Sequence, residues 1–200
     1  DDKKPFIFIN NKLYLYRYFN YETEIENKLR KLINEEKSEL ENRRRKLVSE
    51  LEFIKKLQVN QKGYDSLVNI EKIDWQLIAC LNSFLHNFSI ITGGPGTGKT
   101  TTVAKLLALL YKANPDFKMA LAAPTGKAGM RIQESLKNTF DDELNTAWTE
   151  ELTGLKHKIY NSSPFTIHRL LGFKRNSPYF KHNETNNLKY DVIIIDEASM

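Results

Sequence analysis

The 200-residue sequence contains a single cysteine and no apolar run long enough to cross a membrane. One cysteine excludes a disulfide within the chain and fits a reducing compartment. A membrane-spanning helix needs about 20 consecutive apolar residues, and no signal peptide is visible. The sequence therefore predicts a cytoplasmic protein with no membrane partner.

Neither sign of charge dominates, since the net charge is only +5. A weak basic excess is compatible with nucleic-acid binding but does not indicate it alone. The length allows one sizeable domain and a smaller one. The chain starts with Asp1 instead of methionine and stops at Met200, directly after a motif. We therefore expect an internal fragment of a longer protein.

Metal-ligand patterns are also lacking. His168 lies in the stretch TIHRLLG, but no cysteine or second histidine follows at metal-ligand spacing. His157 and His182 fall in polar segments. We expect His168 to contact DNA or to have a structural role, and not to bind a metal.

What the sequence does contain is the loop GGPGTGKT at residues 93–100, which fits the pattern G-x-x-x-x-G-K-[ST] at every fixed position. Its glycines allow positive φ and a close approach to phosphate. Lys99 supplies a charge for the β- and γ-phosphates of ATP, and the Thr100 hydroxyl is a hard oxygen ligand suited to Mg²⁺. The other predicted nucleotide contacts are Thr101, directly after the loop, and Gly93, Gly94, Pro95, Gly96, Thr97 and Gly98 within it.

The flanks of the loop agree with a phosphate site. Residues 88–92 form a short apolar run typical of a buried strand, and residues 101–111 carry apolar side chains at helical spacing. A strand, a glycine loop and a helix N-terminus in that order bind phosphate. We therefore predict an α/β phosphate-loop domain with a parallel sheet.

The residues before this domain predict a small α+β region. Residues 6–9 and 13–16 are two β-prone runs separated by a turn, which predicts a hairpin. Residues 21–58 follow with a helical apolar stripe. The basic run 43–46 within them could touch nucleic acid or a partner, although a solvated helix face or a break between helices is the preferred interpretation. We place a domain boundary near residue 70, giving regions 1–70 and 71–200.

A helix is predicted from Asp74, a suitable N-cap, through Phe84. Its expected core residues are Trp75, Ile78, Ala79 and Leu85. Gln76 stands a short helix ahead of the phosphate loop. Its amide both donates and accepts, which suits the N6 and N7 edge of adenine.

Two further strands are predicted downstream. Residues 119–123 form the first, followed by a turn and a helix that could also bind a phosphate. Residues 190–195 form the second, which ends in two carboxylates. Asp196 can hold the Mg²⁺ shell beside Thr100, and Glu197 can polarise the attacking water as general base. Between them, residues 138–163 are expected to be a surface insertion with a short helix over 148–156.

These motifs resemble superfamily 1 DNA helicases of the RecD type, the family that includes the alpha subunit of exodeoxyribonuclease V. The resemblance rests on DWQ, ITGGPGTGKTTTVAKLLALL, LAAPTGKAGMRIQESL, TIHRLLGF and DVIIIDEASM, which occur in one order over residues 74–200. The similarity of residues 1–70 is less decisive. The pair Gly129-Met130 departs from the small residues usual at that point of the family's helix.

The resemblance implies an incomplete RecA-like motor domain in which Gln76 reads adenine and single-stranded DNA contacts a further set of residues. That set is Pro124, Thr125, Gly126, Lys127, Thr166 and His168. It implies ATP and Mg²⁺ as cofactors, and the beta and gamma subunits of exodeoxyribonuclease V as partners. Nuclease chemistry would belong to a partner, since no clustered nuclease carboxylates occur here. The second motor domain and its arginine finger would lie beyond Met200.

The expected function is an ATP-dependent helicase that moves 5′ to 3′ and processes DNA double-strand ends for recombinational repair. The fragment alone is expected to be inactive. Two alternatives stay open: a stand-alone RecD-like or PIF-type helicase, and a phosphate-loop ATPase that acts as a switch without separating strands.

Overall fold

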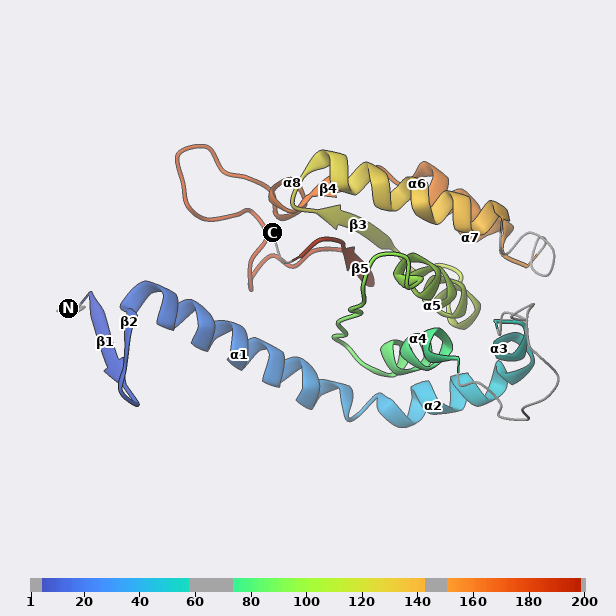
Figure 1. The fold of residues 1–200 in the computed structure, drawn as a ribbon, viewed down its shortest axis with the longest axis horizontal. Helices are drawn as coiled ribbons and strands as arrows, with labels where there is room; N and C mark the ends of the chain where they lie inside the picture. Colours follow the sequence, from blue (N-terminus) through green and yellow to red (C-terminus); the bar gives the residue numbers. More distant parts are fainter. Residues whose placement is uncertain (1–4, 58–73, 143–150, 199–200) are drawn as a thin grey trace.

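A computed structural model describes residues 5–57, 74–142 and 151–198 of the chain. The N-terminal hairpin and a long helix extend away from the α/β part, and residues 173–190 form a loop on the same side of the molecule (Figure 1). None of the described helices is long and apolar enough to span a bilayer. The predicted boundary near residue 70 lies outside the described residues.

The N-terminal hairpin is formed as predicted. β1 (Phe6–Ile9) pairs antiparallel with β2 (Lys12–Leu15). Asn10 and Asn11 form the turn with φ of 50° and 59°. Positive φ at both central residues suits a two-residue hairpin turn, and asparagine tolerates it better than most residues. The local sequence therefore determines this element.

The predicted helical stretch 21–58 is three helices, α1 (Tyr16–Glu36), α2 (Leu40–Ser49) and α3 (Leu51–Leu57). The basic run 43–46 lies inside α2, so the interpretation of that run as a helix break is wrong; the chain breaks at residues 37–39 instead. Arg43 is half-buried and the rest of the run is exposed.

The α/β part has a parallel three-stranded sheet in the order β4-β3-β5. Helices α4 and α5 lie together beside one part of this sheet, and α6 and α7 lie together beside another (Figure 1). The elements are α4 (Trp75–Leu85), α5 (Lys99–Ala113), β3 (Met119–Ala123), α6 (Gly126–Asp142), α7 (Thr153–Asn161), β4 (Phe165–Thr166), α8 (Ile167–Leu171) and β5 (Val192–Ile195). The predicted α/β class and the strand at 119–123 are confirmed, and the strand predicted at 190–195 is formed over Val192–Ile195.

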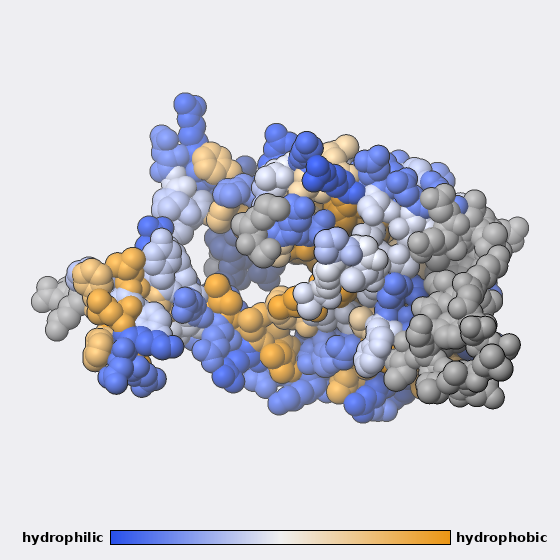
Figure 2. All heavy atoms as spheres, in the orientation of Figure 1, coloured by the Kyte–Doolittle hydropathy of each residue, from blue (hydrophilic) through white to orange (hydrophobic). Residues whose placement is uncertain are grey.

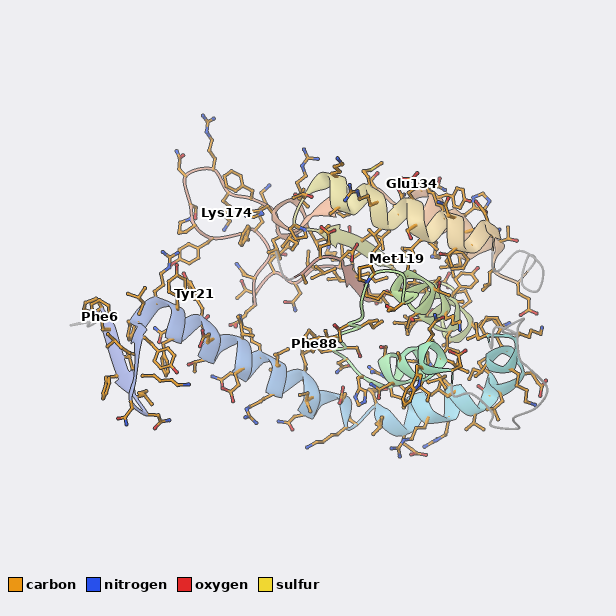
Figure 3. The ribbon with its side chains drawn as sticks, viewed as in Figure 1. Phe6, Tyr21, Phe88, Met119, Glu134 and Lys174 are labelled. Carbon is orange, nitrogen blue, oxygen red and sulfur yellow. The ribbon has the colours of Figure 1, made fainter. Side chains whose placement is uncertain are left out.

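The strand predicted at residues 88–92 is not formed. A strand needs a neighbour that accepts its hydrogen bonds, and this segment pairs with none of the described strands. Ile90 is 77% exposed and Phe88 is 47% exposed. Phe88 lies on the connection that leads from α4 to the phosphate loop (Figure 3). β5 pairs with β3 on one side, and no described strand pairs with its other side, so β5 is an edge strand. Ile193 and Ile195 on β5 are exposed.

The predicted inward face of α4 is also wrong. Trp75 is 71% exposed and Ile78 is exposed, whereas the buried residues are Leu77, Cys80 and Phe84. These three positions recur at helical spacing and face α5 and the core. Burial raises the pKa of the Cys80 thiol to about 12. The cysteine therefore stays a protonated, inert core residue.

The described parts of residues 138–163, namely 138–142 and 151–163, do not form the predicted surface insertion. α6 continues to Asp142, and α7 begins at Thr153, later than the predicted helix over 148–156, part of which lies outside the described residues. Leu152, Leu155 and Ile159 are fully buried against α5 and α6. The polar composition of this stretch concealed a regular apolar stripe, so its helix contributes to the core.

Candidate functional site

The phosphate loop owes its shape to two of its glycines. Gly96 and Gly98 have φ of 73° and 80°, in the left-handed region that residues with a Cβ disfavour. Gly93 and Gly94 do not use positive φ. A Cβ at Gly93 would instead come within 2.5 Å of the Thr97 hydroxyl. The loop therefore requires glycine for conformation at two positions and for space at a third.

Lys99 closes the loop on itself. Its Nζ donates to the carbonyl oxygens of Gly93 and Gly94, at 2.8 Å each. The Thr97 hydroxyl donates to the Gly94 carbonyl at 2.9 Å. α5 begins at Lys99, so the free backbone N–H groups of its first turn lie beside this ammonium. The combination of a lysine and a helix N-terminus is suited to binding an anionic phosphate chain.

The two carboxylates predicted to act in catalysis lie at the end of β5. Asp196 donates its backbone N–H to the Ala122 carbonyl at 3.0 Å, which extends the β3–β5 pairing by one residue. Glu197 then turns the chain sharply with φ of 52°. Both residues line one cavity of about 690 Å³ together with Lys99 and Thr100. The fold thus brings the loop and the strand end, far apart in sequence, to one site.

The residues of this cavity fit a magnesium ion. The Thr100 hydroxyl and the Asp196 carboxylate are hard oxygen donors, which Mg²⁺ prefers. Among the described residues, no group of three or more histidine, cysteine or acidic side chains gathers in a way that could hold a metal ion. Mg²⁺ in nucleotide sites is held by one or two carboxylates and by the phosphates themselves, so a larger ligand cluster is not required.

Gln76 lies against the phosphate loop, and its predicted role in reading adenine stays a prediction. Its side-chain amide donates to the Thr97 carbonyl at 3.4 Å. A Cβ on Gly98 would overlap the Gln76 amide, so this glycine also makes room for the glutamine. Asp74 caps α4 as predicted, since its Oδ1 accepts from the Leu77 N–H at 3.0 Å.

The residues predicted to contact DNA follow two neighbouring strands at one edge of the sheet. β3 and β4 are parallel, with Ala123 opposite Thr166. The Thr125 hydroxyl accepts from the Ala128 N–H, and the Thr166 hydroxyl accepts from the Arg169 N–H, each at 3.2 Å. Both threonines therefore start helices, α6 and α8.

The other members of this predicted set lie beside the two threonines. Gly126 and Lys127 are exposed at the start of α6, and Pro124 is half-buried before it. His168 is exposed on α8, with its ring edge-on to Phe180 at 5.8 Å between centroids.

Sequence reasoning missed an ionic contact that joins α4 to α5. Lys105 is fully buried, and its Nζ donates to Oδ2 of Asp74 at 3.1 Å. The sequence did contain a signal for this contact, because Lys105 falls within the apolar stripe of the helix that follows the phosphate loop.

A second missed cluster joins the N-terminal helices to the segment before the loop. Glu36, at the end of α1, accepts from the Asn87 N–H at 2.8 Å and contacts His86 Nδ1 at 2.9 Å. The Asn87 N–H and the His86 ring hold the pKa of Glu36 below its usual range. Arg43 donates to the Leu85 carbonyl at 3.0 Å and to the Asn87 side chain.

These features define a phosphate-loop NTPase domain. The domain has a parallel sheet and a glycine loop closed by a lysine, and the carboxylates at the strand end lie in the same cavity as that loop. Comparison with protein families agrees. The chain belongs to the AAA-domain family, whose model, described as "AAA domain", matches residues 76–200.

Similar proteins include RecD subunits and a RecD2 helicase. Over 134 residues the chain is 42% identical to the RecBCD enzyme subunit RecD of Haemophilus influenzae, covering 65% of this chain and 20% of that protein. It is 34% identical to RecD of Buchnera aphidicola subsp. Schizaphis graminum over 98% of this chain and 29% of that protein. It is 33% identical to the ATP-dependent RecD2 DNA helicase of Deinococcus radiodurans over 58% of this chain and 12% of that protein. The expected resemblance is confirmed, and the chain spans under a third of these relatives' length.

Proposed function

We propose that the full-length protein is an ATP-dependent DNA helicase that moves 5′ to 3′ on single-stranded DNA. The observation that carries this proposal is the cavity in which Lys99 and Thr100 meet Asp196 and Glu197. ATP phosphates would contact the loop, and Mg²⁺, held by Thr100 and Asp196, would neutralise phosphate charge. Glu197 would accept a proton from the attacking water.

The proposed DNA path crosses the sheet edge at the ends of β3 and β4. Thr125, Thr166 and the first-turn amides of α6 suit phosphate oxygens, and Lys127 adds a full charge. His168 lies exposed on α8 beside Phe180. The β5 carboxylates end at this same edge, because the three strands are parallel. DNA and nucleotide would thus bind one rigid sheet, which allows each to affect the other.

The N-terminal region supports a place in a larger assembly. Phe6, Phe8 and Leu13 on the hairpin are 52%, 70% and 66% exposed. Figure 2 shows apolar side chains gathered on this end of the molecule. Similarity to a RecD subunit extends over 98% of this chain, the hairpin included. We propose that the partners are the beta and gamma subunits of exodeoxyribonuclease V, in a cytoplasmic complex that repairs double-strand ends.

The experiment is an unwinding assay with the full-length protein and its co-purified subunits. Two duplexes are compared. One carries a 5′ single-stranded tail, and the other carries a 3′ single-stranded tail. Because a partner motor could contribute, Lys99→Ala is the control that isolates this subunit. We expect unwinding that depends on Lys99 to require the 5′ tail. Lys99-dependent unwinding from the 3′ tail alone would contradict the proposed direction.

The similarity to RecD2, which is named as a DNA helicase and not as a subunit, supports a second candidate, a helicase that works without partners. Purification distinguishes the two, since a stand-alone helicase would unwind DNA without the two larger subunits. A nucleotide-dependent switch would hydrolyse ATP without stimulation by DNA. We expect the 200-residue chain by itself to hydrolyse ATP negligibly, because loss of an arginine finger costs about 10³-fold or more.

A further inference from the structure

The ion pair between Lys105 and Asp74 buries a charged ammonium, which costs desolvation free energy. Lys105 is fully buried on α5, and its side chain reaches the first turn of α4. Removing a lysine charge from water carries a large penalty that a single carboxylate barely offsets. Apolar residues of similar size at such positions are often equally stable or more stable. Stability alone is therefore a weak reason for this lysine.

The geometry of Asp74 indicates what the pair does. One carboxylate oxygen, Oδ1, caps α4 through the Leu77 N–H at 3.0 Å. The other, Oδ2, accepts from Lys105 at 3.1 Å. A cap alone would fix where α4 begins, and asparagine or serine would suffice. The contact with Lys105 also fixes where that first turn lies along α5, the helix that starts at the phosphate loop.

Gln76 is in the turn that this pair holds. Its amide contacts the Thr97 carbonyl at 3.4 Å and occupies the space that a Cβ on Gly98 would need. Trp75 beside it is 71% exposed, so core packing of that large side chain does not hold the turn. A shift of the turn along α5 would carry Gln76 away from the loop.

We propose that Lys105 and Asp74 are positioning residues that hold Gln76 in register with the phosphate loop and thereby set the preference for adenine over guanine nucleotides. This inference rests on the proposed ATP site and on the role of Gln76 in reading the base that the family resemblance implies. Adenine offers a donor at N6 and an acceptor at N7, which one amide pairs with. Guanine offers acceptors at both positions, so a correctly placed glutamine amide disfavours it.

The test uses the full-length protein with saturating single-stranded DNA and compares kcat/KM for ATP with kcat/KM for GTP. Lys105→Met replaces the ammonium by an apolar side chain of similar length, and Asp74 keeps its cap. We expect the ATP-to-GTP ratio to fall about tenfold, the worth of one well-placed hydrogen bond. The loss should appear in KM for ATP, with kcat at saturating ATP nearly unchanged.

Lys112→Met is the matched control. Lys112 is on the same helix and also forms an ion pair, at 2.9 Å, but its partner is Glu151 and not a residue of α4. Its ATP-to-GTP ratio should equal that of the wild type. If Lys112→Met lowers the ratio as much as Lys105→Met, charge loss on α5 acts generally and the positioning role is wrong.

A double-mutant cycle separates positioning from a general effect. Gln76→Ala should lower the ratio about as much as Lys105→Met, and the combined variant should lower it no further. Additive losses would show that Lys105 acts independently of Gln76 and would overturn the inference. If Gln76→Ala leaves the ratio unchanged, the base-reading role falls and the inference with it. If Gln76→Ala lowers the ATP-to-GTP ratio but the variants of Lys105 and Asp74 do not, Gln76 still reads the base and only the positioning role is wrong.

One further variant keeps the test valid if Lys105→Met folds poorly. Asp74→Asn combined with Lys105→Met removes both charges and keeps a capping side chain. We expect a thermal midpoint near that of the wild type and a ratio still lowered about tenfold. A pair-free protein with the wild-type ratio would overturn the inference.

Discussion

At the scale of single residues, the site depends on side chains whose partners are distant in sequence. Lys105 and Asp74 are 31 residues apart, and His86 and Glu36 are 50 apart. No local pattern specifies such pairs, because each is made by the packing of two helices. The loop residues 93–100 could be predicted because their chemistry is contained in one short segment. The burial of Lys105 could not.

The two carboxylates after β5 should separate nucleotide binding from hydrolysis. In the full-length protein, Glu197→Gln removes the proposed base but keeps the shape of the side chain, so ATP binding should persist while turnover falls about 10²-fold or more. Asp196→Asn removes a proposed metal ligand and should weaken Mg²⁺-dependent ATP binding. Titration with a fluorescent ATP analogue, alongside steady-state turnover, checks both. Equal losses of affinity in the two variants would contradict the assigned roles.

Glu36 should make stability sensitive to acid. Its pKa is lowered in the folded chain by the Asn87 N–H first and His86 next, with Arg43 nearby. Because the pKa of Glu36 is lower in the folded chain, ionised Glu36 adds to the free energy of unfolding above the pKa of an unfolded glutamate, about 4.3. This added stability is lost as pH falls through the pKa of Glu36 in the folded chain. Histidines of an unfolded chain are already protonated below about pH 5. Urea midpoints should therefore fall from pH 5 to pH 3.5 more in the wild type than in Glu36→Gln. Parallel declines would contradict this.

At the scale of elements, the sequence predicted those whose signals are local. The hairpin turn at Asn10 and Asn11, the cap of α4 and the apolar spacing of α5 each reside in a few neighbouring residues. The segment 88–92 has the composition of a strand, but a strand exists only with a hydrogen-bonded neighbour, and none is present among the described residues. Composition alone therefore overstated its structure.

α7 illustrates the opposite error, because a polar segment supplies core residues. Leu155 is fully buried on this helix, so Leu155→Ala should lower the free energy of unfolding by about 2–5 kcal/mol. His157 is exposed on the same helix, and His157→Ala should change it by less than about 0.5 kcal/mol. Urea denaturation of both variants checks the difference. Similar values would mean that α7 lies on the surface, as its composition suggested.

At the scale of the whole molecule, the parallel sheet presents three strand ends at one edge, and the residues proposed to bind nucleotide and DNA follow these ends. Lys127, exposed after β3, should contribute one phosphate contact. In the full-length protein, Lys127→Ala should weaken binding to all single-stranded sequences alike. It should reduce the log–log salt slope by about 0.7. Thr125→Ala, which removes no charge, is the control and should leave the slope nearly unchanged. An unaltered slope in Lys127→Ala would place the DNA elsewhere.

The central claim is that the loop at residues 93–100 powers a DNA-dependent motor. ATP hydrolysis by the purified full-length protein, measured with and without single-stranded DNA, tests it most directly. Because Lys99 is the ammonium that lies in the loop, the wild type should be stimulated by DNA, and Lys99→Ala should lose almost all turnover while remaining folded. Wild-type turnover in Lys99→Ala, or hydrolysis indifferent to DNA in the unaltered protein, would contradict the account.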